Sequence, residues 1–190
     1  MSVRFVQYRA RVFRFLIAAL VVWNYDPGLT RAASQDWEEQ GVTIAAEDVI
    51  LRGSLVLPAG DHRIPGILLL PGSGPTDRNG NQPQLHNDLL RRLALGFAQS
   101  DIATLRADKR GVGGSVSAGM REQDLRFDDY IGDAVRWVEF LRAQPRISSV
   151  FVIGHSEGAL IAIIAAQRTS VEGLVSIAGA GFPLGKVLRR

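Results

Sequence analysis

A glycine-flanked serine is the residue of this sequence best placed for covalent chemistry, in the pentapeptide Gly-His-Ser-Glu-Gly at positions 154–158. A β-branched and aromatic run precedes it at 150–153, and an apolar run follows it at 159–166. These runs predict a buried strand and a buried helix. Gly-x-Ser-x-Gly between a strand and a helix is typical of a nucleophile elbow, a tight turn that exposes the serine oxygen. We therefore predict that Ser156 is a nucleophile.

The two glycines of the pentapeptide have a steric explanation. A strand and a helix joined by so tight a turn can approach each other only where no Cβ lies between them. Gly154 and Gly158 stand two residues before and two residues after the serine, where that need arises. A short pattern is weak evidence by itself, so the strand before it and the helix after it carry the prediction.

A serine hydroxyl is a weak nucleophile at neutral pH and needs a neighbouring base to take its proton. The sequence has three histidines, at positions 62, 86 and 155. We expect His62 in a hairpin turn away from the serine and His86 at the start of a helix. His155 adjoins the serine, but neighbouring side chains diverge on a sharp turn. We therefore expect His155 to line the turn rather than to act as the base.

Apolar periodicity predicts the elements that position this serine. Strands are expected at 42–45, 50–57, 67–70, 102–105, 150–153 and 174–177, and helices with apolar faces at 89–97, 127–141 and 159–166. This order predicts an α/β fold, in which a mostly parallel sheet has helices on both faces. The Gly-rich segments 71–81 and 108–115 follow buried strands, so we expect them at the same edge of the sheet as Ser156.

Residues 42–184 resemble the α/β-hydrolase superfamily, and most closely its exported bacterial serine aminopeptidase-like and dienelactone-hydrolase-like branches. Three ordered motifs carry the resemblance: Leu-Pro-Gly-Ser-Gly-Pro-Thr-Asp-Arg at 70–78 with Gly80 and Asn81, Asp-Lys-Arg-Gly-Val-Gly-Gly-Ser at 108–115, and the pentapeptide at 154–158. The resemblance implies a serine hydrolase that cleaves an ester, a thioester or a small amide through an acyl-enzyme on Ser156.

The resemblance also implies two donors for the negative oxygen that forms when the serine attacks a carbonyl. One is the backbone N–H of Glu157, the residue after the nucleophile. The second is expected from the loop after the first parallel strand, at Ser73. The catalytic assignments are therefore Ser156, Ser73 and Glu157.

Other motif residues have less direct roles in this resemblance. Arg110 and Ser115 are expected to be structural, because their loop mainly fixes the rim of the site. Asp77 and Arg78 would either bind a charged end of the substrate or close their own loop, and the sequence does not separate these two alternatives.

The sequence departs from the family pattern after Ser156. The family places its acid and its histidine after the nucleophile, whereas the carboxylates here are Glu157 and Glu172, and no histidine follows residue 155. Two βα units of roughly 30 residues each would have to supply them. We therefore expect the N-terminal part of a hydrolase that is inactive alone. The alternative is a non-catalytic α/β-hydrolase-like remnant or binding module.

Composition divides the chain into three expected segments. Residues 1–32 predict an export signal, with arginines at the start, an apolar stretch at 15–23 and small residues near 30–32, and they imply a periplasmic or secreted protein. The alternatives are an uncleaved anchor, although nine apolar residues are too few for a membrane span, and a misassigned start codon. Residues 33–41 are expected to be a flexible mature N-terminus, and 42–190 a partial α/β-hydrolase domain.

Charge and the remaining motifs exclude several function classes. The net charge of +3 comes from residues 1–32, and the remainder has 17 basic and 18 acidic residues, so no nucleic-acid surface is expected. The Gly-rich loops lack Walker spacing, the histidines lie on separate elements and there is no cysteine. We therefore expect no cofactor, no metal and no thiol chemistry. The expected partners are a small-molecule acyl substrate and, through an exposed apolar edge strand at 174–177, another chain.

Overall fold

The computed structural model describes residues 36–47 and 49–181. The export signal at 1–32 lies outside these residues, so the signal and the periplasmic or secreted location stay predictions. Of the helices in the described residues, none has the length and apolar character that crossing a bilayer would need.

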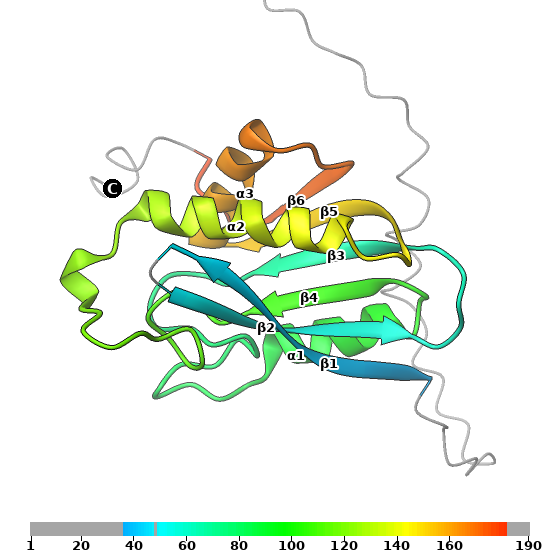
Figure 1. The fold of residues 1–190 in the computed structure, drawn as a ribbon, viewed down its shortest axis with the longest axis horizontal. Helices are drawn as coiled ribbons and strands as arrows, with labels where there is room; N and C mark the ends of the chain where they lie inside the picture. Colours follow the sequence, from blue (N-terminus) through cyan, green and yellow to red (C-terminus); the bar gives the residue numbers. More distant parts are fainter. Residues whose placement is uncertain (1–35, 48, 182–190) are drawn as a thin grey trace, which may run out of the picture. The chain divides into compact units, whose positions relative to one another are not determined.

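Within the described residues, six strands form one mixed sheet with the order β1-β2-β4-β3-β5-β6 (Figure 1). They are β1 (Trp37–Ala46), β2 (Val49–Pro58), β3 (Ile64–Leu70), β4 (Ala103–Ala107), β5 (Ile147–His155) and β6 (Gly173–Ile177). β1 is antiparallel to β2 and β2 to β4, whereas β4, β3, β5 and β6 run parallel. The predicted α/β fold is confirmed, and the carboxyl ends of the parallel strands meet at one edge.

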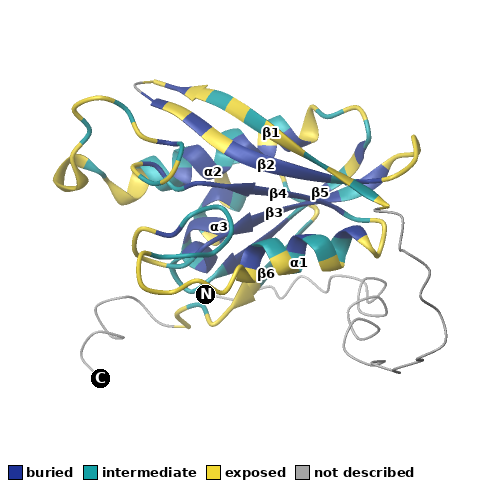
Figure 2. Ribbon diagram, turned by 90° about the horizontal axis from the view of Figure 1, so that it is seen from below, coloured by how far each residue is buried: buried dark blue, intermediate teal, exposed yellow. Residues whose placement is uncertain are grey.

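Helices cover both faces of the sheet (Figure 2). α1 (Leu89–Ala98) packs on one face, and α2 (Phe127–Arg142) and α3 (Glu157–Arg168) pack on the other; a 3₁₀ turn, η1 (Glu122–Asp124), precedes α2. Successive strand residues point to opposite faces. In β3, Leu68 packs into the core under α2 and α3, whereas Ile67 and Leu69 pack into the core under α1. The central strands are mostly apolar because both of their faces are covered; Thr104 and Arg106 of β4 are buried polar exceptions.

β1 begins earlier than the sequence predicted. We expected a flexible segment at 33–41, but residues 37–41 belong to β1 and pair with β2, with Trp37 opposite Pro58. β1 is an edge strand, and its first residues, Trp-Glu-Glu-Gln-Gly at 37–41, are mostly polar, so they lack the apolar alternation that revealed residues 42–45. Its Glu39 pairs with the guanidinium of Arg106, a fully buried side chain on β4.

β6 is the opposite edge of the sheet within the described residues. Leu174 and Val175 are half-buried, and Ile177 is 41% exposed. On the neighbouring helix α3, Ile163 is also 41% exposed. The predicted apolar edge strand is therefore present, next to a helix that exposes an apolar side chain.

Candidate active site

Ser156 lies between the end of β5 and the start of α3, with φ 54° and ψ −115°. A positive φ is unfavourable for a residue with a Cβ and costs on the order of 1–3 kcal/mol. Hydrogen bonds hold Ser156 in this conformation: its N–H donates to the carbonyl of Ile177 (2.8 Å), and its carbonyl accepts from the N–H of Ala159 (3.1 Å). The strand, turn and helix predicted around this serine are therefore all present.

The glycines of the pentapeptide lie where backbone segments touch. A Cβ on Gly154 would lie 2.2 Å from the carbonyl oxygen of Gly158. A Cβ on Gly158 would lie 2.4 Å from the carbonyl oxygen of Pro71 and 2.6 Å from that of Leu70. The first glycine lets α3 approach β5, and the second lets α3 approach the end of β3, so both positions exclude a side chain for the steric reason expected.

A pocket of about 200 Å³ opens beside Ser156. Ser73 lines the same pocket, so the structure brings these two predicted site residues together. Leucines 85, 89 and 90 supply much of the apolar wall, and the described lining contains no aspartate, glutamate, lysine or arginine. Glu157, the third predicted residue, is not part of this lining. Its backbone begins α3, and its carboxylate pairs with Lys109.

The loop after β3 is closed by its own side chains. Asp77 Oδ1 accepts hydrogen bonds from the N–H groups of Asn79 (2.8 Å) and Asn81 (2.9 Å). Gln82 Nε2 donates to the carbonyl of Ser73 (2.9 Å). Of the two alternatives for Asp77, the structure supports closure of its own loop.

Arg78 is bound to Asp108, at the carboxyl end of β4. The Arg78 Nη2–Asp108 Oδ2 distance is 2.5 Å, and the Arg78 backbone N–H donates to Oδ1 (2.9 Å). Gly114 N–H donates to Oδ2 (2.8 Å). Burial raises the pKa of the Asp108 carboxyl, but the hydrogen bonds from Arg78 and Gly114 outweigh it, so the pKa lies below its ordinary value. Arg78 therefore joins two loops of the rim through an ionised carboxylate.

Arg110 and Ser115 also make internal contacts. Arg110 donates two hydrogen bonds to Asp133 on α2, from Nε (3.0 Å) and Nη2 (2.7 Å), and both side chains are buried. Burial raises the pKa of Asp133 even though Arg110 opposes the shift. The Ser115 hydroxyl donates to the carbonyl of Asp108 (3.2 Å) and accepts from the N–H of Arg52 (2.9 Å). These contacts agree with the structural roles expected for Arg110 and Ser115.

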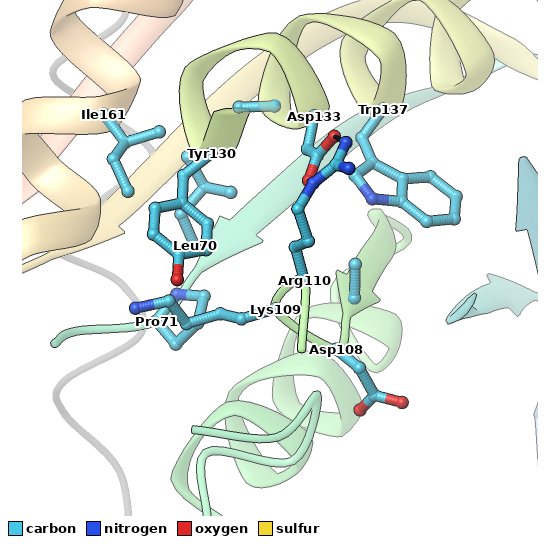
Figure 3. Close-up of a pocket in the computed structure, with 11 residues that line it drawn as sticks. Leu70, Pro71, Asp108, Lys109, Arg110, Tyr130, Asp133, Trp137 and Ile161 are labelled. Atoms are coloured by element: carbon cyan, nitrogen blue, oxygen red, sulfur yellow. Dashed lines mark hydrogen bonds and ion pairs between the residues drawn. The ribbon is translucent and has the colours of Figure 1, made fainter. Parts of the chain in front are cut away.

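Lys109 is a residue of the site that the sequence analysis missed. Its ammonium lies 2.8 Å from Glu157 Oε2, 3.3 Å from the carbonyl oxygen of Gly72 and 4.7 Å from the centroid of the Tyr130 ring. Figure 3 shows its side chain extending beside Pro71, below Tyr130. The side chain is only 9% exposed. Its place in the Asp-Lys-Arg motif was the available signal, but nothing in the sequence pairs it with a glutamate 48 residues later.

The histidines do not contact the serine hydroxyl. His62 is hydrogen-bonded to Asp101 (2.6 Å), near the amino ends of β3 and β4 and thus at the edge of the sheet opposite Ser156. His86 is exposed, and His155 lines the pocket with its ring against Gly72. Among the described residues, no hydrogen bond joins Ser156 to a histidine, and no cluster of three or more His, Asp or Glu side chains could hold a metal ion.

The strand order and the two layers of helices define an α/β hydrolase. Residues 85–186 match the family described as serine aminopeptidase, S33, and the chain belongs to this family. It is similar to esterase EstD of Thermotoga maritima, with 29% identity over 154 residues, which cover 81% of this chain and 35% of the esterase. The predicted resemblance is thereby confirmed at the level of the family and the fold.

Two solved structures show the same fold. A hypothetical protein from Pseudomonas aeruginosa has a TM-score of 0.63 and 20% identity, over 82% of this chain and 51% of that one. A dienelactone hydrolase from Anabaena variabilis has a TM-score of 0.58 and 26% identity, over 76% of this chain and 64% of that one. The chain therefore spans 35% of the length of the esterase and less than two thirds of each of these structures.

Proposed function

We propose that the chain is the nucleophile-bearing part of a serine hydrolase that cleaves an ester, a thioester or a small amide. The observation that carries the proposal is the strained backbone of Ser156, held at φ 54° on the wall of a pocket. Proteins retain such strain where it positions a reacting group, and a serine between a strand and a helix is the arrangement of an exposed nucleophile. Membership in a hydrolase family supports the same class of activity.

In the proposed reaction, Ser156 Oγ bonds to the carbonyl carbon of the substrate while a base takes its proton. The carbonyl oxygen becomes negative in a tetrahedral intermediate. When the C=O bond forms again, the bond to the leaving group breaks, and the alcohol, thiol or amine takes the proton from the base. Water then releases the acid from the acyl-enzyme by the same steps. The pocket wall suits a small uncharged group of the substrate, because its described lining contains no aspartate, glutamate, lysine or arginine.

Two backbone N–H groups are proposed to stabilise the negative oxygen. Glu157 begins α3, and the first N–H groups of a helix have no partner within the helix. Ser73 lines the pocket from the loop after β3. Losing one such donor typically slows acyl transfer by about 10²–10³-fold.

The base and its acid are proposed to be missing from this chain, whose three histidines are His62, His86 and His155. His62 faces the wrong edge of the sheet, and His155 is directed against Gly72. Without a base, the hydroxyl of Ser156 would react slowly, so we expect little turnover by the 190-residue chain alone. A non-catalytic binding module remains the competing function, because Ser156 has no histidine partner among the described residues.

Covalent labelling by a fluorophosphonate tests the proposal. Because the base is proposed to be missing, we expect the probe to attach to Ser156 only slowly and at alkaline pH, as located by peptide mass spectrometry, and attachment to disappear in Ser156→Ala. Labelling that is unchanged in Ser156→Ala, or no labelling after prolonged incubation at alkaline pH, would favour the binding module. Hydrolysis of p-nitrophenyl acetate, measured alongside, tells whether the chain alone turns over.

We also propose that β6 pairs with β6 of a second copy. The strand is an edge within the described residues and carries exposed Ile177, and unpaired apolar edges recruit other strands. Sedimentation velocity over a range of concentrations should show association, and Ile177→Lys should weaken it. Ile50→Lys is the matched control, because Ile50 is 49% exposed but lies away from β6, on β2, opposite Ala45 of β1. A single monomeric species at every concentration would contradict the proposal.

A further inference from the structure

Lys109 contacts both segments that carry the proposed oxyanion donors. One contact is with the carboxylate of Glu157, whose own N–H is one donor. The other is with the carbonyl of Gly72, which belongs to the same peptide unit as the N–H of Ser73, the second donor. One segment is the start of α3 and the other is the loop after β3, so a single cation fixes their relative position.

The contact with Gly72 bears on the direction of the Ser73 N–H. The peptide unit is planar, and no cis peptide bond occurs in the described residues, so the C=O and N–H of this unit point in opposite directions. A Gly72 carbonyl drawn toward Lys109 therefore turns the Ser73 N–H away from Lys109. Lys109 lines a small cavity next to Pro71, whereas Ser73 and Ser156 line the pocket that Pro71 also borders. The Ser73 N–H is thus turned away from Lys109, and Ser73 itself lines the pocket with Ser156.

The surroundings of Lys109 favour a fixed ammonium. The side chain is 9% exposed, and the Tyr130 ring centroid lies 4.7 Å from Nζ, within the range of a cation–π contact. A lysine is a compact cation with three donors, so it can serve a carboxylate and a carbonyl in different directions. Through its contacts with the Glu157 carboxylate and the Gly72 carbonyl, Lys109 links the start of α3 to the loop after β3.

We infer that Lys109 is a positioning residue that sets the distance and direction of the two oxyanion donors, Glu157 N–H and Ser73 N–H. The inference rests on the proposed function, because the donors matter only if Ser156 forms a tetrahedral adduct. A purely structural ion pair would stabilise the fold and leave the geometry around such an adduct unchanged.

Phosphonylation of Ser156 by a p-nitrophenyl alkylphosphonate measures this geometry. The adduct carries a phosphoryl oxygen where the oxyanion would lie, the rate follows from release of p-nitrophenolate, and the ³¹P chemical shift reports the hydrogen bonds to that oxygen. We expect Lys109→Met to slow phosphonylation on the order of 10- to 100-fold, somewhat less than outright loss of a donor, and to change the ³¹P shift. Glu157→Gln keeps the backbone donor and the Gly72 contact, so it should slow the reaction less.

A double variant, with both Lys109 and Glu157 replaced, tests whether the two residues act together or contribute to the rate independently. If both contacts act through Lys109, the Lys109→Met/Glu157→Gln protein should react no more slowly than Lys109→Met alone, because coupled residues are not additive. Arg121→Met is the matched control: it also removes one positive charge, from an exposed ion pair with Asp124, and should leave the rate and the ³¹P shift unchanged. Thermal unfolding by circular dichroism establishes that each variant is folded. If Lys109→Met does not fold, Glu157→Gln is the variant whose rate and ³¹P shift are compared with those of the wild type.

The outcomes distinguish this inference from the proposed function. Wild-type protein that reacts at Ser156, together with Lys109→Met that reacts equally fast and has the same ³¹P shift, would overturn the role of Lys109 and leave the nucleophile in place. Additive slowing in the double variant would do the same. Wild-type protein that is not phosphonylated at Ser156 would overturn the proposed function and the role of Lys109 with it.

Discussion

Replacing Ser156 with glycine is expected to stabilise the protein and to abolish its covalent labelling at the same time. The serine has φ 54°, a conformation that costs on the order of 1–3 kcal/mol for a residue with a Cβ. Glycine adopts positive φ freely but loses up to about 1 kcal/mol more chain entropy on folding. The net gain in the free energy of unfolding should therefore be about 1 kcal/mol, measured by urea denaturation followed by circular dichroism.

Ser156→Ala is the control that separates strain from chemistry. Alanine lacks the hydroxyl, so fluorophosphonate labelling should be lost as completely as in Ser156→Gly. It keeps the Cβ, so the strain remains, and the free energy of unfolding should stay within about 0.5 kcal/mol of the wild-type value. If Ser156→Gly is no more stable than Ser156→Ala, then the backbone at this position stores no energy and the observation that carries the proposed function loses its meaning.

The buried elements of this fold were predictable because their signals are local. Strands covered on both faces are continuously apolar, as at Val150–Ile153. β5 contains this run, and α3 contains the apolar run at 159–166 that predicted a buried helix. The turn between them could be predicted because Gly154 and Gly158 meet a steric need that only glycine fulfils. β1 was misjudged at its start because edge strands face water, and a polar strand resembles a loop in sequence.

The charged contacts of the site could not be predicted, because they join residues distant in the chain. Arg106 stands in an apolar strand, and only the structure shows that its buried guanidinium reaches Glu39 on β1 and Asn79 in the loop after β3. Lys109 is a similar case. A sequence motif places such a residue at the correct edge of the sheet, but its partners depend on how separate loops fold over that edge.

Among the substitutions proposed here, Asp108→Asn is expected to lower the free energy of unfolding most, by about 3 kcal/mol at pH 7. Removing one partner of a buried ion pair typically costs 3–5 kcal/mol, and the lower end applies because Arg78 is 23% exposed. Asp108 itself is 4% exposed and also accepts the N–H groups of Arg78 and Gly114, so the amide of asparagine cannot reproduce all of its contacts. Urea denaturation at pH 7 measures the difference from wild type.

The pH dependence of this difference identifies its electrostatic origin. The pKa of Asp108 is lower in the folded protein than its ordinary value of about 3.9, so its contribution to stability is fully present above that pH and is lost as the pH falls through the folded pKa. The gap between wild type and Asp108→Asn should therefore narrow below about pH 4. Asp124→Asn breaks an exposed pair with Arg121 and should cost at most about 0.5 kcal/mol. A gap for Asp108→Asn that stays constant down to pH 3 would mean that packing, rather than the charge on Asp108, joins the two loops beside Ser156.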